Sequence, residues 1–265
     1  MNDNVRIVCL LAFLLFYTSV FAQKKITTRN VSESVRYATV DRPGELYIVT
    51  VNGQIQRFDR DGNVASVYKN NPAPTLFDPR DGSRLFAYFR SDQHFEFLDP
   101  SFAVTRSGKL DPAVAIDPWL MCMSGDYNFW VFDAADKSLK KINASNGTVT
   151  VDAKISEQAG DSISSYVYLR EYQGFVFLHH TKKGVMVFSS LGKPLKTIGL
   201  AAITHFNFLG EEFYYHNNGT LNFFNLFTAE TREMPLKQSG KFVLLTDERM
   251  FVINDKSIDF FEIKP

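Results

Sequence analysis

Four of the five histidines could bind a metal ion if the fold brought them together. They are His179, His180, His205 and His216, and three converging imidazoles would suit zinc or nickel. His179, His180 and His216 lie next to predicted hairpins of two neighbouring repeats. These hairpins differ in length, and adjacent residues such as 179 and 180 point to opposite faces of a strand. We therefore expect histidines in exposed loops or at strand edges rather than metal ligands.

The single cysteine of the exported chain is a candidate nucleophile inside an apolar run. Cys122 lies in Trp-Leu-Met-Cys-Met, where neither a histidine nor an electropositive setting is present to activate it. We expect a small buried hydrophobe. The sequence contains no Gly-x-Ser-x-Gly, Walker or His-Glu-x-x-His motif. No glycosidase-type pair stands out among the 29 acidic residues, and we predict no catalytic, cofactor-binding or metal-binding residue.

The N-terminus reads as a signal peptide over residues 1–22, followed by one domain over residues 23–265. Arg6 gives the positive start, residues 7–16 are apolar, and small residues at Val20 and Ala22 mark a cleavage site before Gln23. The alternative is a membrane anchor, but residues 7–22 fall short of the roughly 20 residues that span a bilayer. No other apolar stretch is long enough for a span. The Phe-Ala-Gln junction resembles signal peptides of Bacteroidota, which implies a Gram-negative periplasm.

Composition limits the fold and the partners. The chain carries 29 basic and 29 acidic side chains, so it has no net positive charge that would attract nucleic acid. Its 25 Phe and 11 Tyr favour strands and large buried contacts. With one cysteine left after cleavage, the apolar core must hold the fold without an internal disulfide.

A repeat of about four strands runs along the chain. In residues 37–68, strands are predicted at 37–40, 45–51, 54–58 and 63–68, separated by tight turns such as Asn52-Gly53. The third strand of each repeat ends in an apolar residue followed by a polar one. The apolar residues are Phe58, Leu98, Ile142, Phe188, Phe224 and Phe261, with spacings of 40, 44, 46, 36 and 37 residues. Such a period is typical of β-propeller blades.

The last repeat is incomplete, which indicates how the ring closes. Residues 241–246, 250–253 and 257–263 supply three strands, and we expect residues 25–32 to add the missing outer strand. The prediction is an all-β, single β-propeller of about six four-stranded blades, with five or seven as alternatives. A β-sandwich or β-solenoid would not explain the split terminal repeat.

The first repeat resembles the six-bladed propeller family of NHL-repeat and SMP-30-type proteins. The likeness is carried by Val40-Asp41, Gly44-Glu45-Leu46-Tyr47, Ile55-Gln56-Arg57-Phe58-Asp59 and Asp61-Gly62. WD40 signatures do not recur at blade spacing. SMP-30-type enzymes hold a divalent cation through carboxylates and amides on inner strands. The corresponding candidates are Asp41, Asp78, Asp117, Glu171 and Asp247.

We expect turn roles for these carboxylates rather than cation binding. Asp41 and Asp117 each follow an apolar residue, as Asp does at the turn after an inner strand. No Glu opens the first inner strand in the way the family's ligand does. The third-strand aromatics Phe95, Phe97, Phe223, Phe224, Phe260 and Phe261 are expected in the core. Tyr88, Trp119 and Tyr127 lie near predicted loops, where they could anchor a partner.

Two functions remain open. The first is a non-enzymatic periplasmic protein-binding propeller without a cofactor, an accessory subunit of an outer-membrane complex such as the type IX secretion machinery. Its partner would be an outer-membrane β-barrel or its subunits. The alternative is an SMP-30-type cation-dependent hydrolase or a small-ligand-binding propeller. A cluster of three acidic or amide side chains in the central channel would favour this alternative.

Overall fold

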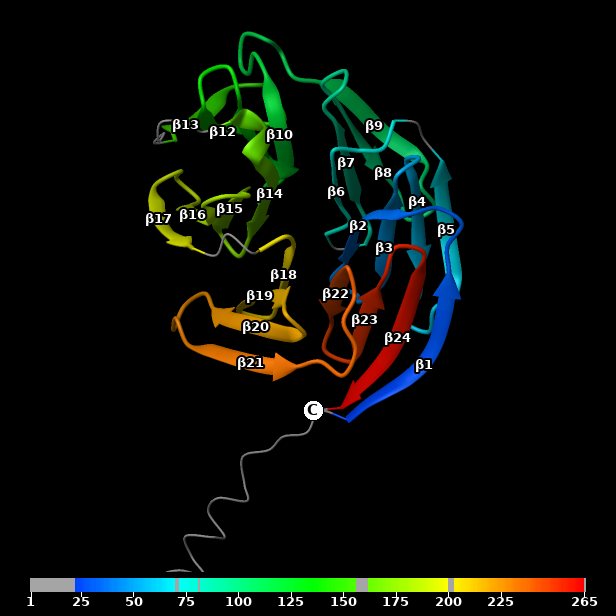
Figure 1. Ribbon diagram of the computed structural model, residues 1–265. Coiled ribbons are helices and arrows are strands. Elements are labelled where there is room, and N and C mark those ends of the chain that lie inside the picture. The colour runs from blue at the N-terminus through cyan, green and yellow to red at the C-terminus, as the bar shows by residue number, and fades with distance from the viewer. Residues whose placement is uncertain (1–21, 70–71, 81, 156–161, 200–202, 265) are drawn as a thin grey trace, which may run out of the picture.

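Each repeat folds as one four-stranded antiparallel sheet, and the six sheets stand in a ring (Figure 1). The computed structural model describes residues 22–69, 72–80, 82–155, 162–199 and 203–264. The predicted signal peptide lies outside these ranges except for Ala22. The protein is an all-β, six-bladed propeller, as the repeat period predicted, and its blades are numbered 1 to 6 in chain order.

The four strands of a blade run from the channel to the rim. The inner strands are β2 (Val35–Val40), β6 (Leu76–Asp78), β10 (Pro118–Met123), β14 (Tyr166–Tyr172), β18 (Phe206–Leu209) and β22 (Phe242–Leu245). The second strands are β3 (Leu46–Thr50), β7 (Leu85–Phe89), β11 (Phe129–Asp133), β15 (Phe175–His180), β19 (Glu212–Asn217) and β23 (Arg249–Ile253). The third strands are β4 (Gln54–Phe58), β8 (His94–Leu98), β12 (Ser138–Ile142), β16 (Gly184–Ser189), β20 (Thr220–Asn225) and β24 (Ser257–Lys264). The outer strands are β5 (Val64–Lys69), β9 (Val104–Lys109), β13 (Val149–Lys154), β17 (Pro194–Ile198), β21 (Thr231–Pro235) and β1 (Ala22–Asn30).

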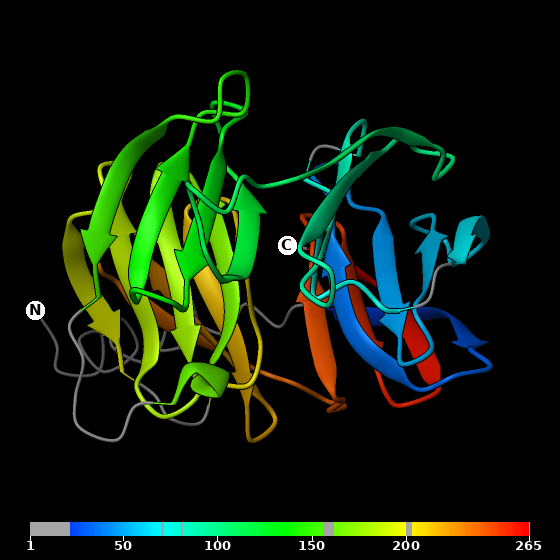
Figure 2. The same cartoon turned by 90° about the horizontal axis from the view of Figure 1, so that it is seen from above.

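Hairpin connections place every loop at one of two faces (Figure 2). Each inner strand begins at one face, and the second strand returns to it, so this face carries the hairpins between second and third strands. We call it the entry face. The opposite face carries the hairpins between first and second strands. A short 3-10 helix, η1 (Ile163–Ser165), precedes β14. Within the described ranges, no helix is long and apolar enough to cross a membrane.

The ring closes through both ends of the described chain. Strand β1 pairs antiparallel with β24, from Ala22 opposite Lys264 to Asn30 opposite Ser257, and the two strands lie side by side in Figure 1. The Asp259 carboxylate accepts a hydrogen bond from Thr28 Oγ1 at 2.6 Å and pairs with Lys25 Nζ at 2.7 Å. The prediction that an N-terminal segment completes the last blade is confirmed. The strand begins earlier than expected and ends at Asn30.

The polar residue after the third strand is a turn cap. In blades 1 to 5 its side-chain oxygen accepts two backbone N–H groups from the following turn, which stabilises that turn locally. The capping residues are Asp59, Asp99, Asn143, Ser189 and Asn225. In blade 6 the corresponding Glu262 lies inside β24, because the closing strand comes from β1 rather than from a hairpin.

Bulky side chains fill the wedges between blades. The third-strand aromatics are buried as predicted, apart from the partly buried Phe224. Cys122 is also fully buried, and burial raises the pKa of its thiol. Tyr88 lies one residue before the end of β7, near a loop as predicted, but it is not accessible to anchor a partner. Its ring is fully buried between blades, and its hydroxyl donates to the Pro118 carbonyl.

Candidate functional site

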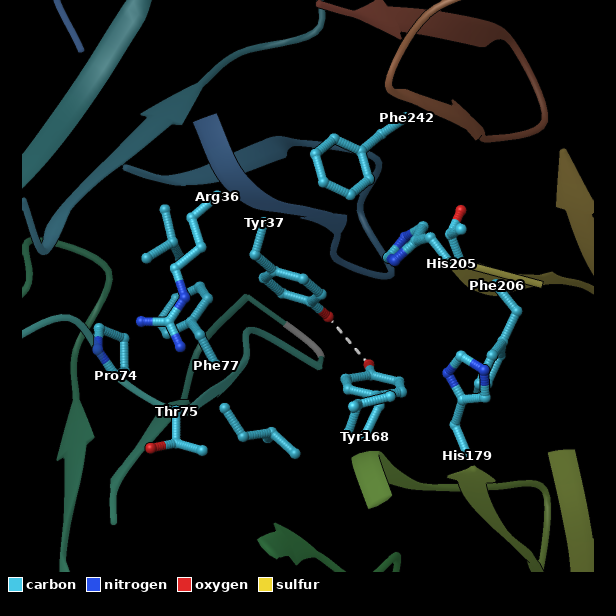
Figure 3. Close-up of a pocket in the computed structure, with 14 residues that line it drawn as sticks. Arg36, Tyr37, Pro74, Thr75, Phe77, Tyr168, His179, His205, Phe206 and Phe242 are labelled. Atoms are coloured by element: carbon cyan, nitrogen blue, oxygen red, sulfur yellow. Dashed lines mark hydrogen bonds between the residues drawn. The ribbon is translucent and has the colours of Figure 1, made fainter. Parts of the chain in front are cut away.

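A cavity of about 200 Å³ opens at the entry face, at the mouth of the central channel (Figure 3). We call it the channel-mouth pocket. Its lining comes from blades 1, 2, 4, 5 and 6, mainly from the first residues of their inner strands. The walls combine aromatic and aliphatic side chains with a few polar groups. Arg36 is the charged residue of the described lining.

Two tyrosines from opposite blades form the floor of the pocket. The Tyr37 hydroxyl on β2 lies 2.9 Å from the Tyr168 hydroxyl on β14, and the two share a hydrogen bond (Figure 3). Blades 1 and 4 stand across the ring from each other, so this bond bridges the channel. Burial raises the pKa of both phenols, although the nearby Arg170 opposes this shift. Both side chains therefore stay protonated near neutral pH.

A buried cation lies below this floor. Arg170 follows Tyr168 by two residues, which places both side chains on the channel side of β14. Its guanidinium donates to Asn207 Oδ1 at 3.1 Å. Burial opposes the charged form, but Tyr168 and Asp78 outweigh it and keep the pKa of Arg170 raised. Arg170 and Asp78 therefore place opposite charges close to each other beneath the pocket.

His179 contributes a buried imidazole to the lining of the pocket. The residue is 2% exposed, and its Nε2 has no hydrogen-bond partner. Burial lowers the pKa of the imidazole to about 4, against an interaction with the backbone of Ile203 that raises it. The side chain is therefore neutral at pH 7.

His205 forms another part of the wall. Its ring lies edge-on to Tyr37 at 5.6 Å and to Phe242 at 5.1 Å between centroids. Nε2 of His205 also lacks a partner. Burial, with Arg170 and His179 nearby, lowers its pKa to about 3. Two neutral, buried imidazoles thus form part of the wall of a largely aromatic pocket.

The prediction of exposed histidines is wrong for His179 and His180. Both lie on β15, a second strand with neighbouring blades against both faces, so opposite-facing side chains are buried alike. His180 packs edge-on to Tyr166, away from the pocket, and its Nδ1 accepts backbone N–H groups of the next turn. His216 Nε2 accepts the Gly219 N–H at 3.2 Å, a hairpin role. The fold separates the sequence-predicted histidines and brings only His179 and His205 to one pocket.

The carboxylates considered as cation ligands are spread over two ends of the channel. Asp41 accepts the Gly44 and Glu45 N–H groups at 2.9 and 2.8 Å, which is the turn role predicted for it. Asp117 lies before β10 rather than after an inner strand, so that expectation is wrong. Asp247 is exposed in the turn between β22 and β23.

The two remaining carboxylates of this set share one arginine. Arg80 lies 3.2 Å from Asp78 and 3.6 Å from Glu171, near the channel mouth opposite the pocket. Glu171 also accepts the N–H groups of Gly125 and Gly174. Burial disfavours the Asp78 carboxylate, but Arg80 and Arg170 outweigh it and lower its pKa. Among the described residues, no three His, Cys, Asp or Glu side chains form a group that could hold a metal.

The aromatic residues considered as partner anchors lie in different places. Trp119 is half-buried on β10, where its indole Nε1 donates to the Tyr166 carbonyl at 2.8 Å and Arg90 stacks on its ring at 3.7 Å. Tyr127 is 60% exposed in the hairpin between β10 and β11. That hairpin belongs to the face opposite the pocket. Neither side chain lines the channel-mouth pocket.

Comparison with known proteins identifies the architecture and nothing finer. No protein-family model and no curated protein matches the sequence. Solved β-propellers do match. The β-propeller domain of Cps50 (Swd1) from Myceliophteria thermophila is 10% identical, with 92% of this chain and 100% of that one covered and a TM-score of 0.61.

Two further structures agree with this assignment. The Pan2 WD40 domain from Neurospora crassa is 10% identical over 92% of this chain and 96% of that one, with a TM-score of 0.58. BBS1N, solved in complex with ARL6DN, is 12% identical over 92% and 97%, with a TM-score of 0.56. At these identities the likeness shows the fold alone. The chain is thus a β-propeller of six blades.

Proposed function

We propose that this protein is an exported, non-enzymatic propeller that binds a partner protein through its entry face. The observation that carries the proposal is the open, aromatic-walled pocket at the mouth of the channel. Interfaces place their strongest contacts in such pockets, where a buried aromatic anchor of the partner fits. BBS1N was solved in complex with another protein, ARL6DN. We propose that this chain likewise binds a protein partner.

Exposed apolar side chains at the entry face support a protein partner. Val51 is 56% exposed in the hairpin after β3, Ile116 is 67% exposed before β10, and Val167 is 41% exposed at the start of β14. All three belong to loops or strand ends at the entry face. A partner that covered the entry face would bury these side chains, which would add apolar area to the interface.

The cellular setting of this proposal comes from the sequence. The signal-peptide pattern over residues 1–22 supports export, and its cleavage junction supports a periplasm of the Bacteroidota type. We propose the role of an accessory subunit of an outer-membrane protein complex such as the type IX secretion machinery, with an outer-membrane β-barrel or its subunits as partner. Kinship with NHL-repeat and SMP-30-type propellers is proposed on the likeness of the first repeat.

A small-ligand-binding propeller is the second candidate, and the same pocket favours it. The SMP-30-type hydrolase has less support, because Asp41, Asp78 and Glu171 are held by turns and by Arg80. Affinity purification of the tagged protein from its native membranes in mild detergent, followed by mass spectrometry, separates the candidates. Stoichiometric co-purification of outer-membrane subunits supports the accessory role, and elution of the protein alone contradicts it.

Two exposed positions make matched variants for this experiment. Ile116→Arg alters the entry face, and Leu191→Arg alters a 79% exposed residue in the hairpin between β16 and β17 on the opposite face. Surface substitutions of this kind change stability little, about 0.5 kcal/mol or less. The proposal predicts that Ile116→Arg loses the partner and that Leu191→Arg keeps it. The reverse pattern would place the interface on the other face.

A further inference from the structure

Arg36 brings an unpaired positive charge to the channel-mouth pocket. It is an exposed residue of β2, and its side chain extends along the side of the pocket where Pro74 and Thr75 lie (Figure 3). Among the described residues, no hydrogen bond or ion pair engages its guanidinium. No carboxylate belongs to the described lining either. The pocket therefore attracts an anionic group and disfavours a cationic one.

A single guanidinium selects a carboxylate over a phosphate group. The planar guanidinium donates two parallel hydrogen bonds to the two oxygens of a carboxylate, which is the geometry of strong charge-assisted pairs. A phosphate group carries up to two negative charges at neutral pH. Its second charge would have no partner in the wall, because His179 and His205 are neutral at pH 7. One carboxylate thus matches the charge of the lining.

Aromatic rings form much of the wall that stays open to solvent. Tyr37 and Tyr168 on the floor and Phe242 on β22 are all partly exposed. Aromatic pairs gain free energy from offset or edge-on contact in addition to the buried area. A cavity of about 150 Å³ is enough to hold benzene, and this one measures about 200 Å³. The pocket therefore has room for one ring with a short acidic substituent.

We propose that the channel-mouth pocket binds a small aromatic monocarboxylate of the benzoate class, whose carboxylate pairs with Arg36 and whose ring lies against Tyr37 and Tyr168. The inference goes beyond the protein-binding role, because it assigns a free small molecule to the pocket. The contact needs only side chains of this chain. It therefore holds with or without a protein partner on the entry face.

The first test compares probes that share a ring and differ in charge. NMR titration of the intact protein at pH 7 and low salt measures the dissociation constants of benzoate, benzyl alcohol and benzylammonium. Benzoate should bind with a dissociation constant of about 1 mM. Benzyl alcohol should bind about tenfold more weakly, and benzylammonium more weakly still. Equal affinities of benzoate and benzyl alcohol, tighter binding of benzylammonium, or no benzoate binding up to about 20 mM overturns the proposal.

The second test removes the charge at one position. Arg36→Gln should weaken benzoate binding to the level of benzyl alcohol and leave benzyl alcohol unchanged. The matched control is Arg42→Gln, an exposed arginine of the same blade in the turn between β2 and β3, on the opposite face. This control should bind benzoate like the wild type, and both exposed substitutions should change stability little. Wild-type affinity in Arg36→Gln, or equal losses in the two variants, overturns the pairing with Arg36.

The third test locates the bound probe. Nuclear Overhauser effects should connect the benzoate ring protons to the methyl groups of Thr75 and Val167, which line the pocket and are accessible to solvent. Raising the salt from about 20 mM to about 500 mM should weaken benzoate binding several-fold and affect benzyl alcohol little, because the guanidinium is exposed. Contacts confined to residues outside the pocket, or a benzoate affinity independent of salt, overturns the proposal.

Discussion

Acidification from pH 7 to pH 5 is expected to destabilise the folded protein through its buried imidazoles. Burial lowers the pKa of His179 to about 4 and that of His205 to about 3. In the unfolded chain both titrate near pH 6.5. Between these values the unfolded state binds more protons than the folded state. The free energy of unfolding therefore falls as the pH drops through this window.

The size of the effect follows from the two pKa values of each histidine. Proton linkage gives a loss of about 2 kcal/mol per imidazole between pH 7 and pH 5, or about 4 kcal/mol for the pair. The neighbouring Arg170, Tyr37 and Tyr168 keep one protonation state across this range, because their pKa values are raised. Carboxylates with lowered pKa lose their stabilising charge only at lower pH, near and below about 4.

Urea unfolding of the wild type and of two single variants, at pH 7, 6 and 5, measures this loss. His179→Phe and His205→Phe should each reduce the loss between pH 7 and pH 5 by about half. His179→Phe also removes the interaction with the backbone of Ile203, which changes stability at every pH. The change in the free energy of unfolding between pH 7 and pH 5 is therefore compared, rather than its value at one pH. The half-buried His216 gives a control, His216→Phe, which should keep most of the dependence. A wild type that loses less than about 1 kcal/mol, or variants that leave its slope unchanged, would refute the assigned burial.

Three further predictions concern the architecture, each measured by urea unfolding. Gly62→Ala should lower the free energy of unfolding by about 2–3 kcal/mol, because φ is +85° and the new Cβ would lie 2.9 Å from a side chain of β1. The control Gly147→Ala, at φ +72° with nothing within 4 Å of the new Cβ, should lower it by only about 1 kcal/mol. Equal losses would contradict tight packing of β1. Asp259→Ala should lower the free energy of unfolding by about 2 kcal/mol, because it removes the contacts of this carboxylate with β1. The control Asp61→Ala breaks an exposed ion pair and should lower it by less than about 1 kcal/mol. A small effect at Asp259 would mean that the contacts that close the ring contribute little to stability. Asn143→Ala should cost about 1 kcal/mol by removing a turn cap, and an unchanged midpoint would deny the capping role of the repeat marker.

The sequence was informative where local chemistry repeats. Asp59 and Asn143 mark the same turn in different blades because a short side chain must accept the backbone N–H groups that follow. That requirement recurs at each third strand and reveals the period. The missing outer strand of the last repeat then identified the closing segment, since a propeller leaves no blade unfinished.

Inner strands were harder to locate from the sequence. Strands β6 and β18 span only Leu76–Asp78 and Phe206–Leu209, and most of their residues are buried. Short strands with both faces buried show no alternation of apolar and polar residues. For the same reason the buried His179 on β15 could not be told from an exposed residue of a hairpin.

The candidate site could not be predicted, because its parts meet only when the ring closes. Tyr37 and Tyr168 are 131 residues apart and bond across the channel. Nothing in either local sequence indicates the other. The His179 ring likewise packs edge-on to Phe206 of the next blade, with 6.0 Å between the centroids.

Hydrogen exchange of the protein with and without its co-purified partner tests the central claim most directly. The account predicts that the partner protects amides at the entry face, in residues 36–37, 167–168 and 204–206, which line the pocket. Protection confined to the opposite face, in the hairpins at residues 189–193 and 225–230, would contradict it.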